Sequence, residues 1–365
     1  MKIHTRNISS KNKASYEVCD VVTGSGMMVS FSPLGASVQK IAIISEDGEE
    51  TLLALSFAGQ DAAGDCIGYA GATLGPNAGR IRNSCISIDG RDYPLAANEG
   101  SCQLHGGPHN LSSVLWHTDF VEQDRDFVRI TFSAFQPHGE DGYPGNRTYK
   151  AVYTLDDTGW LTVHYKAFTD RTTYINLSSH IYWNLTGDFT RNALDQELTL
   201  FSSNVGLLDE AHLPVNICPV GRTPFDFRKG RSLTQAMGAR TGAMYREQLL
   251  REQGYNHPFL LKKARPRRPL PSVRQVPALQ KACVLRDPAS GRTMQMMTSA
   301  PVLVVYSGGF LPENRLLANG QRSTASCAIA LEAQDFPDVM HMLPEAWRLT
   351  GAGEMFERVI RFHVI

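Results

Sequence analysis

The sequence has no net charge that would direct it toward a charged partner. Lysine and arginine together number 36, aspartate and glutamate also number 36, and the formal net charge is +0. A chain without a field of one sign has no general attraction to nucleic acid or to anionic lipid. The composition therefore favours a neutral small molecule as the partner and predicts neither nucleic-acid nor membrane binding.

Paired cysteines and long apolar runs are also missing. The seven cysteines are odd in number, scattered, and never spaced as Cys-x-x-Cys, which argues against a disulfide framework and a zinc knuckle. No stretch approaches the roughly 18 consecutive apolar residues of a membrane-spanning helix. Residues 1–7 lack the apolar segment of a signal peptide. These features predict a cytoplasmic protein.

Helical periodicity is scarce, and apolar residues alternate with polar ones along most of the chain. Alternation over residues 127–135 is typical of a half-buried strand, and the alternating residues 355–365 are expected to close a sheet. Asp89 and Gly90 separate two such runs, as does the segment 156–159, which predicts antiparallel hairpins. The strongest helical candidate, residues 232–250, contains two interrupting glycines, Gly238 and Gly242.

No repeat, linker or composition break marks a domain boundary. The sequence therefore predicts one all-β domain over residues 1–365, built as a large antiparallel architecture. A basic, proline-rich stretch at about residues 262–281 is expected to be an exposed loop insertion, because proline cannot donate to a strand ladder. Such a run could touch nucleic acid or a phosphorylated ligand. The absence of interleaved aromatic residues favours a solvated loop instead.

Two histidines occur in turn-rich surroundings that would expose their side chains. His105 precedes Gly106 and Gly107, and glycine allows another group to approach the backbone closely. His180 follows a polar segment and precedes Tyr182 and Trp183, of which Trp183 is more typical of a core position. Imidazole gives and takes protons near neutral pH. A lone histidine is, however, more often a structural hydrogen-bonding group.

An arginine and a glutamate complete the candidate set. Arg80 follows a glycine- and proline-rich segment, and its fork of donors suits an oxygen-rich ligand, but the residue alone favours a surface salt bridge. Glu332 ends an apolar run, where a carboxylate is costly unless it is paired or used. Partial burial would raise its pKa toward that of a general base. The two histidines and Glu332 lack the short spacing of metal ligands, so no metal is predicted.

These segments together resemble the aldose 1-epimerase (galactose mutarotase) family along nearly the whole chain. Seven matching pieces occur in family order, at residues 35–36, 71–81, 104–107, 140–145, 176–185, 223–228 and 331–334. The resemblance implies a single large antiparallel β-sandwich of the galactose mutarotase type. It also implies an isomerase of carbohydrate metabolism that interconverts the α and β anomers of a free aldohexose such as glucose or galactose.

The resemblance assigns roles to residues of this chain. Glu332 is implied as the general base that takes the proton of the anomeric hydroxyl, and His180 as the general acid that protonates the ring oxygen. Arg80 and His105 are implied as substrate-binding donors. The sugar ring opens and recloses without a cofactor or a metal, because the same pair returns the protons. A monomer or a homodimer is expected.

Two positions depart from the family pattern. Asn256 stands where the family usually has an aspartate that binds sugar hydroxyls, and Val304 stands where some members have a glutamine. Because charge-assisted hydrogen bonds are roughly twice as strong as neutral ones, Asn256→Asp is expected to tighten the binding of an ordinary hexose. Two alternatives remain at this point. One is a non-catalytic sugar-binding or regulatory relative, and the other is an epimerase of a phosphorylated or acidic sugar.

Overall fold

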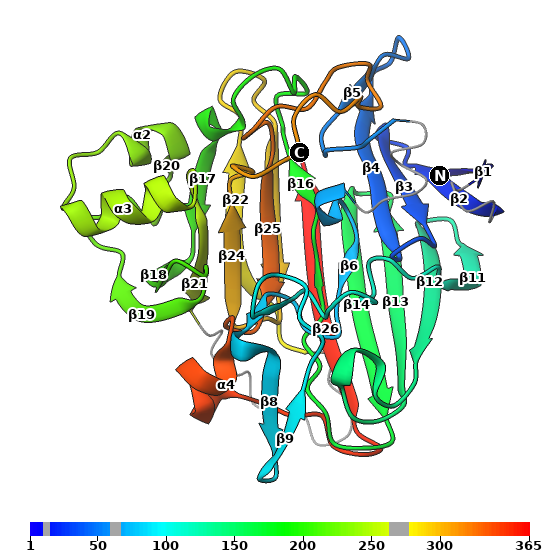
Figure 1. Cartoon of the computed structure of the whole chain (residues 1–365). Helices are drawn as coiled ribbons and strands as arrows, with labels where there is room; N and C mark the ends of the chain where they lie inside the picture. Colours follow the sequence, from blue (N-terminus) through cyan, green and yellow to red (C-terminus); the bar gives the residue numbers. More distant parts are fainter. Residues whose placement is uncertain (10–14, 59–66, 263–276) are drawn as a thin grey trace.

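The computed structural model describes residues 1–9, 15–58, 67–262 and 277–365, which fold into antiparallel sheets with few helices (Figure 1). The larger sheet has nine strands in the spatial order β11 (His117–Gln123), β12 (Phe127–Gln136), β13 (Arg147–Asp156), β14 (Trp160–Thr169), β26 (Met355–Val364), β23 (Thr293–Thr298), β22 (Gln280–Arg286), β17 (Glu197–Leu200) and β20 (Arg231–Ser232). The second has six strands, β16 (Tyr182–Trp183), β25 (Ile329–Gln334), β24 (Val302–Tyr306), β21 (Asn256–Leu261), β18 (Ser202–Leu208) and β19 (Pro214–Pro219).

Smaller sheets surround this pair. A five-stranded meander contains β1 (Lys2–Ser9), β2 (Ser15–Val22), β3 (Met27–Ser32), β4 (Ser37–Ile44) and β5 (Glu50–Leu52). The two-stranded pairs are β6 (Thr73–Leu74) with β15 (Ser178–Ser179), β7 (Arg80–Ile81) with β10 (Gln103–Leu104), and β8 (Cys85–Ile88) with β9 (Arg91–Pro94). Three short helices, α2 (Leu233–Met237), α3 (Ala243–Arg251) and α4 (Val339–Met342), lie outside the sheets. Helices α2 and α3 lie on one side of the sandwich and the meander on the other (Figure 1).

The core lies between the two large sheets. The ring of Trp183, on the six-stranded sheet, packs 5.2 Å from that of Phe362 on the nine-stranded sheet. Trp183 is fully buried, which confirms its expected place in the core. In β13 and β14 alternate residues are buried, so the period of two seen in the sequence corresponds to one face on the core. The expected all-β antiparallel sandwich is therefore confirmed.

Local turn chemistry agrees with the sequence in most places. The hairpin of β8 and β9 turns at Asp89 and Gly90, both with positive φ, as a tight hairpin requires. The helical stretch is split into α2 and α3, with Gly238 as the C-cap of α2 and Gly242 as the N-cap of α3. The C-terminal strand differs from expectation. Strand β26 pairs with β14 on one side and β23 on the other, so it joins two halves of the sheet rather than closing an edge.

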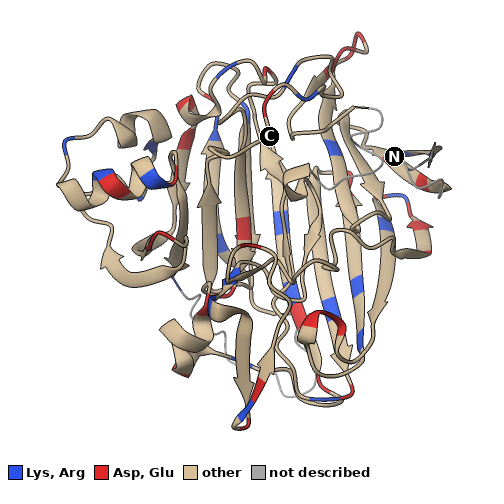
Figure 2. Cartoon of the chain, in the orientation of Figure 1, with Lys and Arg blue, Asp and Glu red and all other residues tan. Residues whose placement is uncertain are grey.

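The expected basic loop lies mostly outside the described residues. Strand β21 ends at Leu261, and β22 already begins at Gln280, so Gln280 and Lys281 belong to a strand rather than to the loop. Figure 2 shows acidic and basic residues interspersed over the sheets and connections, in keeping with the zero net charge. Within the described ranges, no helix is long and apolar enough to cross a membrane.

Candidate active site

The outer face of the six-stranded sheet forms the floor of a cavity of about 340 Å³, within the usual range of ligand pockets. Strand register builds this floor. Glu332 of β25 pairs with Val304 of β24, which pairs in turn with Pro258 of β21. Tyr306 pairs with Asn256 in the next row of the same face. Because side chains two residues apart share a face, adjacent central strands present these groups together.

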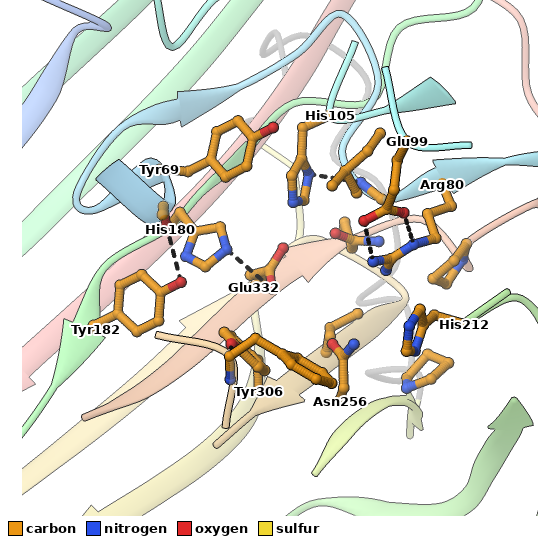
Figure 3. Close-up of a pocket in the computed structure, with 18 of the residues that line it drawn as sticks. Tyr69, Arg80, Glu99, His105, His180, Tyr182, His212, Asn256, Tyr306 and Glu332 are labelled. Atoms are coloured by element: carbon orange, nitrogen blue, oxygen red, sulfur yellow. Dashed lines mark hydrogen bonds and ion pairs between the residues drawn. The ribbon is translucent and has the colours of Figure 1, made fainter. Parts of the chain in front are cut away.

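All five residues proposed from the sequence line this one cavity, although they come from five separate segments of the chain (Figure 3). They are Arg80, His105, His180, Asn256 and Glu332. Val304, the second position that departs from the family pattern, also lines the cavity, directly opposite Glu332 in the strand register. The tertiary structure thus brings together the residues that the sequence singled out.

His180 and Glu332 face each other on the cavity floor. Nε2 of His180 lies 3.6 Å from Oε1 of Glu332, and the side chains are only 4% and 5% exposed. His180 is fixed by its backbone, whose N–H donates to the carbonyl of Ala72 and whose carbonyl accepts from the N–H of Gly71. The distance is too long for a direct hydrogen bond. It leaves both polar groups available to a third molecule.

Burial sets the protonation of this pair. Loss of water raises the pKa of Glu332 to about 8, an effect that the charge of Arg80 partly opposes. The same burial lowers the pKa of His180 to about 3. Between these two values the pair as a whole carries one proton, and in the empty cavity that proton resides on Glu332. One shared proton is what a paired acid and base require.

His105 is held in a single tautomer by the segment that contains Arg80. Its backbone N–H donates to the carbonyl of Gly79 at 3.0 Å, and its Nδ1 accepts from the N–H of Gly79 at 3.1 Å. Burial lowers the pKa of His105 well below its usual value, so the ring is neutral. Because Nδ1 is the acceptor, Nε2 carries the proton. His105 therefore acts as a hydrogen-bond donor.

The same tautomer bears on metal binding. His105, His180 and Glu332 place one ligand atom each within 4.8 Å of one another. A metal ligand must offer a lone pair, but Nε2 of His105 is protonated, and moving that proton to Nδ1 would set it against the N–H of Gly79. The donor set therefore does not fit a metal ion.

Arg80 is oriented by a carboxylate that the sequence did not single out. Its Nε and Nη2 donate to the two oxygens of Glu99 at 2.5 and 2.9 Å. This bidentate pair fixes the plane of the guanidinium while leaving its other donors unoccupied by Glu99. Arg80 therefore forms a salt bridge and also lines the cavity, as does its partner Glu99.

Aromatic side chains form the walls. The ring of His180 lies 4.6 Å from that of Tyr182 and 6.1 Å from that of Tyr69, measured between centroids. Tyr182 donates its hydroxyl to the carbonyl of Gly68, and the hydroxyl of Tyr306 accepts from the N–H of Phe310. With their hydroxyls engaged, these rings present largely apolar surface to the cavity.

Several of the lining residues were missed by sequence reasoning. They are Tyr69, Glu99, Tyr182, His212, Tyr306, Phe310 and Gln334. One signal was available for Tyr182. It is the neighbour of Trp183, and successive strand residues point to opposite faces. Because Trp183 is in the core, Tyr182 had to face the other side. No comparable local signal marks Glu99 or His212, which reach the cavity only through the folding of loops.

Comparison with known proteins agrees with this geometry. The family described as aldose 1-epimerase matches residues 18–360. The galactose mutarotase of Homo sapiens is 30% identical over 329 residues, which cover 90% of this chain and 88% of the relative. The aldose 1-epimerase of Escherichia coli (strain K12) is 27% identical, with 88% and 87% covered.

A solved structure gives the same result. The galactose 1-epimerase from Lactobacillus acidophilus NCFM superposes with a TM-score of 0.80 at 25% identity, over 100% of this chain and 99% of that one. Family, relatives and fold therefore agree over almost the full length. The chain belongs to the aldose 1-epimerase family and is an isomerase with aldose 1-epimerase activity.

Proposed function

We propose that this enzyme interconverts the α and β anomers of a free aldohexose such as glucose or galactose, with Glu332 as general base and His180 as general acid. The observation that carries the proposal is the buried pair itself. A carboxylate and an imidazole face each other 3.6 Å apart on the floor of a sugar-sized cavity. The anomeric hydroxyl oxygen and the ring oxygen are bonded to the same carbon, so one such pair can reach both.

The reaction needs only these two groups. The carboxylate of Glu332 takes the proton of the anomeric hydroxyl while Nε2–H of His180 delivers a proton to the ring oxygen, and the bond from C1 to the ring oxygen breaks. The open-chain aldehyde rotates about the C1–C2 bond. On closure, the new hydroxyl returns its proton to His180, and Glu332 returns its proton to the former carbonyl oxygen. Protons balance over the cycle, so no cofactor takes part.

The protonation of the empty site fits this cycle. Ring opening starts from ionised Glu332 and protonated His180. It ends with protonated Glu332 and neutral His180, and burial favours this second state when no substrate is bound. Both states hold one proton on the pair. Arg80 favours ionised Glu332, and hydroxyl donors of a bound sugar would do so further. Binding therefore shifts the pair toward the state that opens the ring.

The remaining walls suit a neutral sugar. His105 offers a fixed N–H donor and Arg80 an oriented guanidinium, while Tyr69, Tyr182 and Tyr306 offer faces for sugar C–H groups. Arg80 and Glu99 pair with each other at the cavity, and Glu252 pairs with His212. This pairing leaves little free charge for a phosphate or a carboxylate. The basic residues invoked for a phosphorylated sugar lie outside the described part of the chain. A cytoplasmic location and a monomeric or dimeric state remain predictions.

A direct test is the rate of anomer exchange of pure α-glucose or α-galactose, followed by polarimetry or NMR. Glu332→Gln keeps the shape of the side chain and removes its basic oxygen, so turnover should fall by about two orders of magnitude or more. Hexose binding should survive. A Glu332→Gln enzyme with a near-native rate would exclude Glu332 as the base.

The chain offers a matched control for this substitution. Glu357 pairs with His164 at 3.1 Å on the nine-stranded sheet, away from the cavity residues. Glu357→Gln makes the same chemical change in another histidine–glutamate pair, and it should leave turnover unchanged. A wild-type protein that does not exceed the uncatalysed rate would support the non-catalytic alternative.

A further inference from the structure

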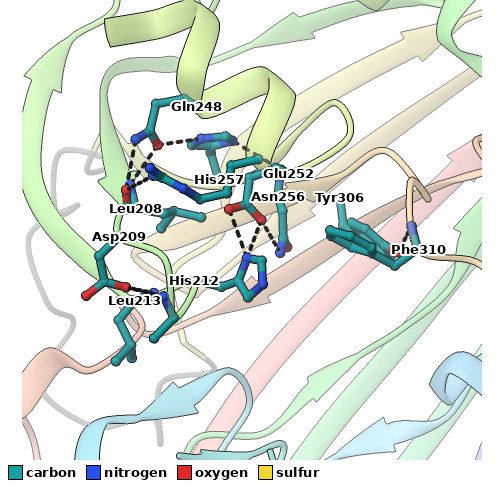
Figure 4. Close-up of polar contacts among 12 residues, drawn as sticks. Leu208, Asp209, His212, Leu213, Gln248, Glu252, Asn256, His257, Tyr306 and Phe310 are labelled. Carbon is teal, nitrogen blue, oxygen red and sulfur yellow. Dashed lines mark hydrogen bonds and ion pairs between the residues drawn. The ribbon is translucent and has the colours of Figure 1, made fainter. Parts of the chain in front are cut away.

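A buried carboxylate lies directly behind the cavity wall that Asn256 forms. Glu252 is the C-cap of α3, and its side chain is 0% exposed. Its Oε2 accepts a 3.0 Å hydrogen bond from Nδ2 of Asn256. Nδ1 of His212 lies 2.9 and 2.8 Å from its two oxygens. Figure 4 shows Glu252 between these two side chains, both of which line the cavity.

The surroundings hold this arrangement in place. The side-chain amide of Gln248 exchanges two 2.8 Å hydrogen bonds with the backbone of Leu208, which ties α3 to β18. Oε1 of Gln248 also accepts from Nε2 of His257, at 3.1 Å. Nδ1 of His257 then accepts the backbone N–H of Asn256. Both the backbone and the side chain of Asn256 are thus fixed from behind the cavity.

The chemistry of Glu252 determines which end of the Asn256 amide faces the cavity. A carboxylate only accepts hydrogen bonds, so the NH₂ group of Asn256 must point toward Glu252. The carbonyl oxygen Oδ1 is then the atom left for a ligand. Rotation of the amide by half a turn would set oxygen against oxygen at a buried position, which is unfavourable.

We propose that Glu252 is a positioning residue that makes Asn256 an obligatory hydrogen-bond acceptor, so that this wall selects sugars with a free hydroxyl donor and rejects those with an anionic acceptor there. The inference rests on the proposed function and deepens it, because it names the substrate class as neutral, unsubstituted aldoses. The negative charge that an aspartate would place at position 256 lies instead on Glu252. It is separated from the substrate by the amide of Asn256.

This arrangement reverses an expectation from the sequence. With Glu252 behind it, Asn256→Asp would place two carboxylates about one hydrogen-bond length apart, and like charges sharing a site destabilise each other. The variant should therefore bind hexose more weakly, with a Michaelis constant raised about tenfold. Turnover should change little, because the contact lies away from the bonds that break and form.

The test is a double-mutant cycle on anomer exchange. Glu252→Gln alone permits the amide of Asn256 to invert, and it should raise the Michaelis constant several-fold at nearly constant turnover. When Glu252→Gln is combined with Asn256→Asp, the carboxylate and the amide exchange places, and the carboxylate again presents an oxygen to the sugar. The Michaelis constant of this double variant should return to within about threefold of the wild type. Merely structural damage from the two changes would add rather than cancel.

Asn216→Asp provides the matched control, since Asn216 is exposed on β19 and does not line the cavity. It should leave both constants unchanged. An Asn256→Asp enzyme that binds hexose as well as or better than the wild type overturns the inference, as does a double variant worse than either single one. In both cases wild-type mutarotation would still stand. A wild type without mutarotation would instead remove the proposed function.

A second measurement does not depend on the stability of the Glu252 variants. The 2-, 3-, 4- and 6-deoxy hexoses each lack one hydroxyl. With the wild type, one of them should lose about tenfold in kcat/KM relative to its parent sugar, and Asn256→Ala should abolish that difference. If no deoxy sugar shows a loss that depends on Asn256, this residue does not accept a substrate hydroxyl and the inference fails.

Discussion

At the scale of single residues, several side chains of the site use one hydrogen-bonding group to contact the protein and leave the other for a ligand. His105 gives Nδ1 to the backbone of Gly79 and keeps one donor, Nε2–H. Arg80 donates from Nε and Nη2 to Glu99. Asn256 gives its amino group to Glu252. For His105 and Asn256 the partner decides whether the remaining group is a donor or an acceptor, and for Arg80 it fixes the plane of the remaining donors, so the hydrogen-bonding groups offered to the ligand are set before it binds.

The pair of Arg80 and Glu99 gives a prediction at this scale. Glu99→Gln replaces a bidentate charged contact by a weaker neutral one and lets the guanidinium turn, so kcat/KM for hexose should fall about tenfold, which corresponds to ~1.4 kcal/mol. The steady-state rate of anomer exchange measures it. Glu122→Gln is the control, because Glu122 pairs with Arg129 at 2.9 Å on the exposed edge of the large sheet. Equal rates for the two variants would mean that Glu99 does not orient Arg80.

At the scale of elements, two very short strands place the donor histidine. Strands β7 and β10 pair over only two residues each, Arg80 opposite Leu104 and Ile81 opposite Gln103. The chain then turns at His105, with φ 51°, and passes Gly75 at close range through Gly106. A side chain at Gly106 would overlap the carbonyl oxygen of Gly75. The glycine is needed here for close approach as well as for its φ of 99°.

A pair of glycine substitutions separates these two requirements. Gly48 has a φ of 87° but nothing within 4 Å of an added Cβ, so Gly48→Ala should cost only about 1–2 kcal/mol of unfolding free energy for its backbone conformation. Gly106→Ala adds a backbone clash and should cost at least about 3 kcal/mol. Chemical denaturation of both variants measures the difference. Similar losses would show that the approach to Gly75 relaxes easily.

At the scale of the whole molecule, the sandwich creates the environment that sets the protonation of His180 and Glu332. One face of the six-stranded sheet packs on the core through Trp183, and the other carries Glu332 and the cavity. Glu332 lies on the central strand β25 with its side chain toward the cavity, where His180 and the other lining residues leave it only 5% exposed. Its raised pKa is therefore a consequence of the packing of remote segments rather than of any neighbouring residue in the sequence.

The dependence of rate on pH follows from this burial. The pKa of Glu332 is raised to about 8 and that of His180 is lowered to about 3, so the pair holds one proton between these values. Above pH 8 the pair loses this proton, and below pH 3 it gains a second one. Hence kcat/KM should be level from about pH 4 to 7 and should fall above pH 8, approaching tenfold per unit.

Anomer exchange measured from pH 4 to 10, with the uncatalysed rate subtracted, checks this profile. The pH at which the rate falls on the alkaline side shows which residue of the pair loses the essential proton. A fall centred near the ordinary imidazole value of about 6.5 would assign that limb to His180 and contradict the burial argument. A rate that stays level beyond pH 9 would mean that neither residue of the pair loses an essential proton in this range.

The sequence alone determined what depends on neighbours along the chain. Alternation over β12, β13 and β14 and the turn at Asp89 and Gly90 set the all-β antiparallel architecture, because the strand period and positive φ are local properties. The ordered motifs of the resemblance supplied Arg80, His105, His180, Asn256 and Glu332 as candidates. The structure brought those five residues together, while their roles remain proposals.

Only the tertiary structure decided which groups meet. Glu99 approaches Arg80, and Glu252 approaches His212, through loops whose contacts no local pattern encodes. The position of β26 in the middle of its sheet also depends on pairing between distant strands. Desolvation, which sets the protons on His180 and Glu332, depends on everything packed around them. Strand periodicity depends on adjacent residues of the chain, whereas burial and the choice of donor or acceptor at the site arise only when remote segments pack together.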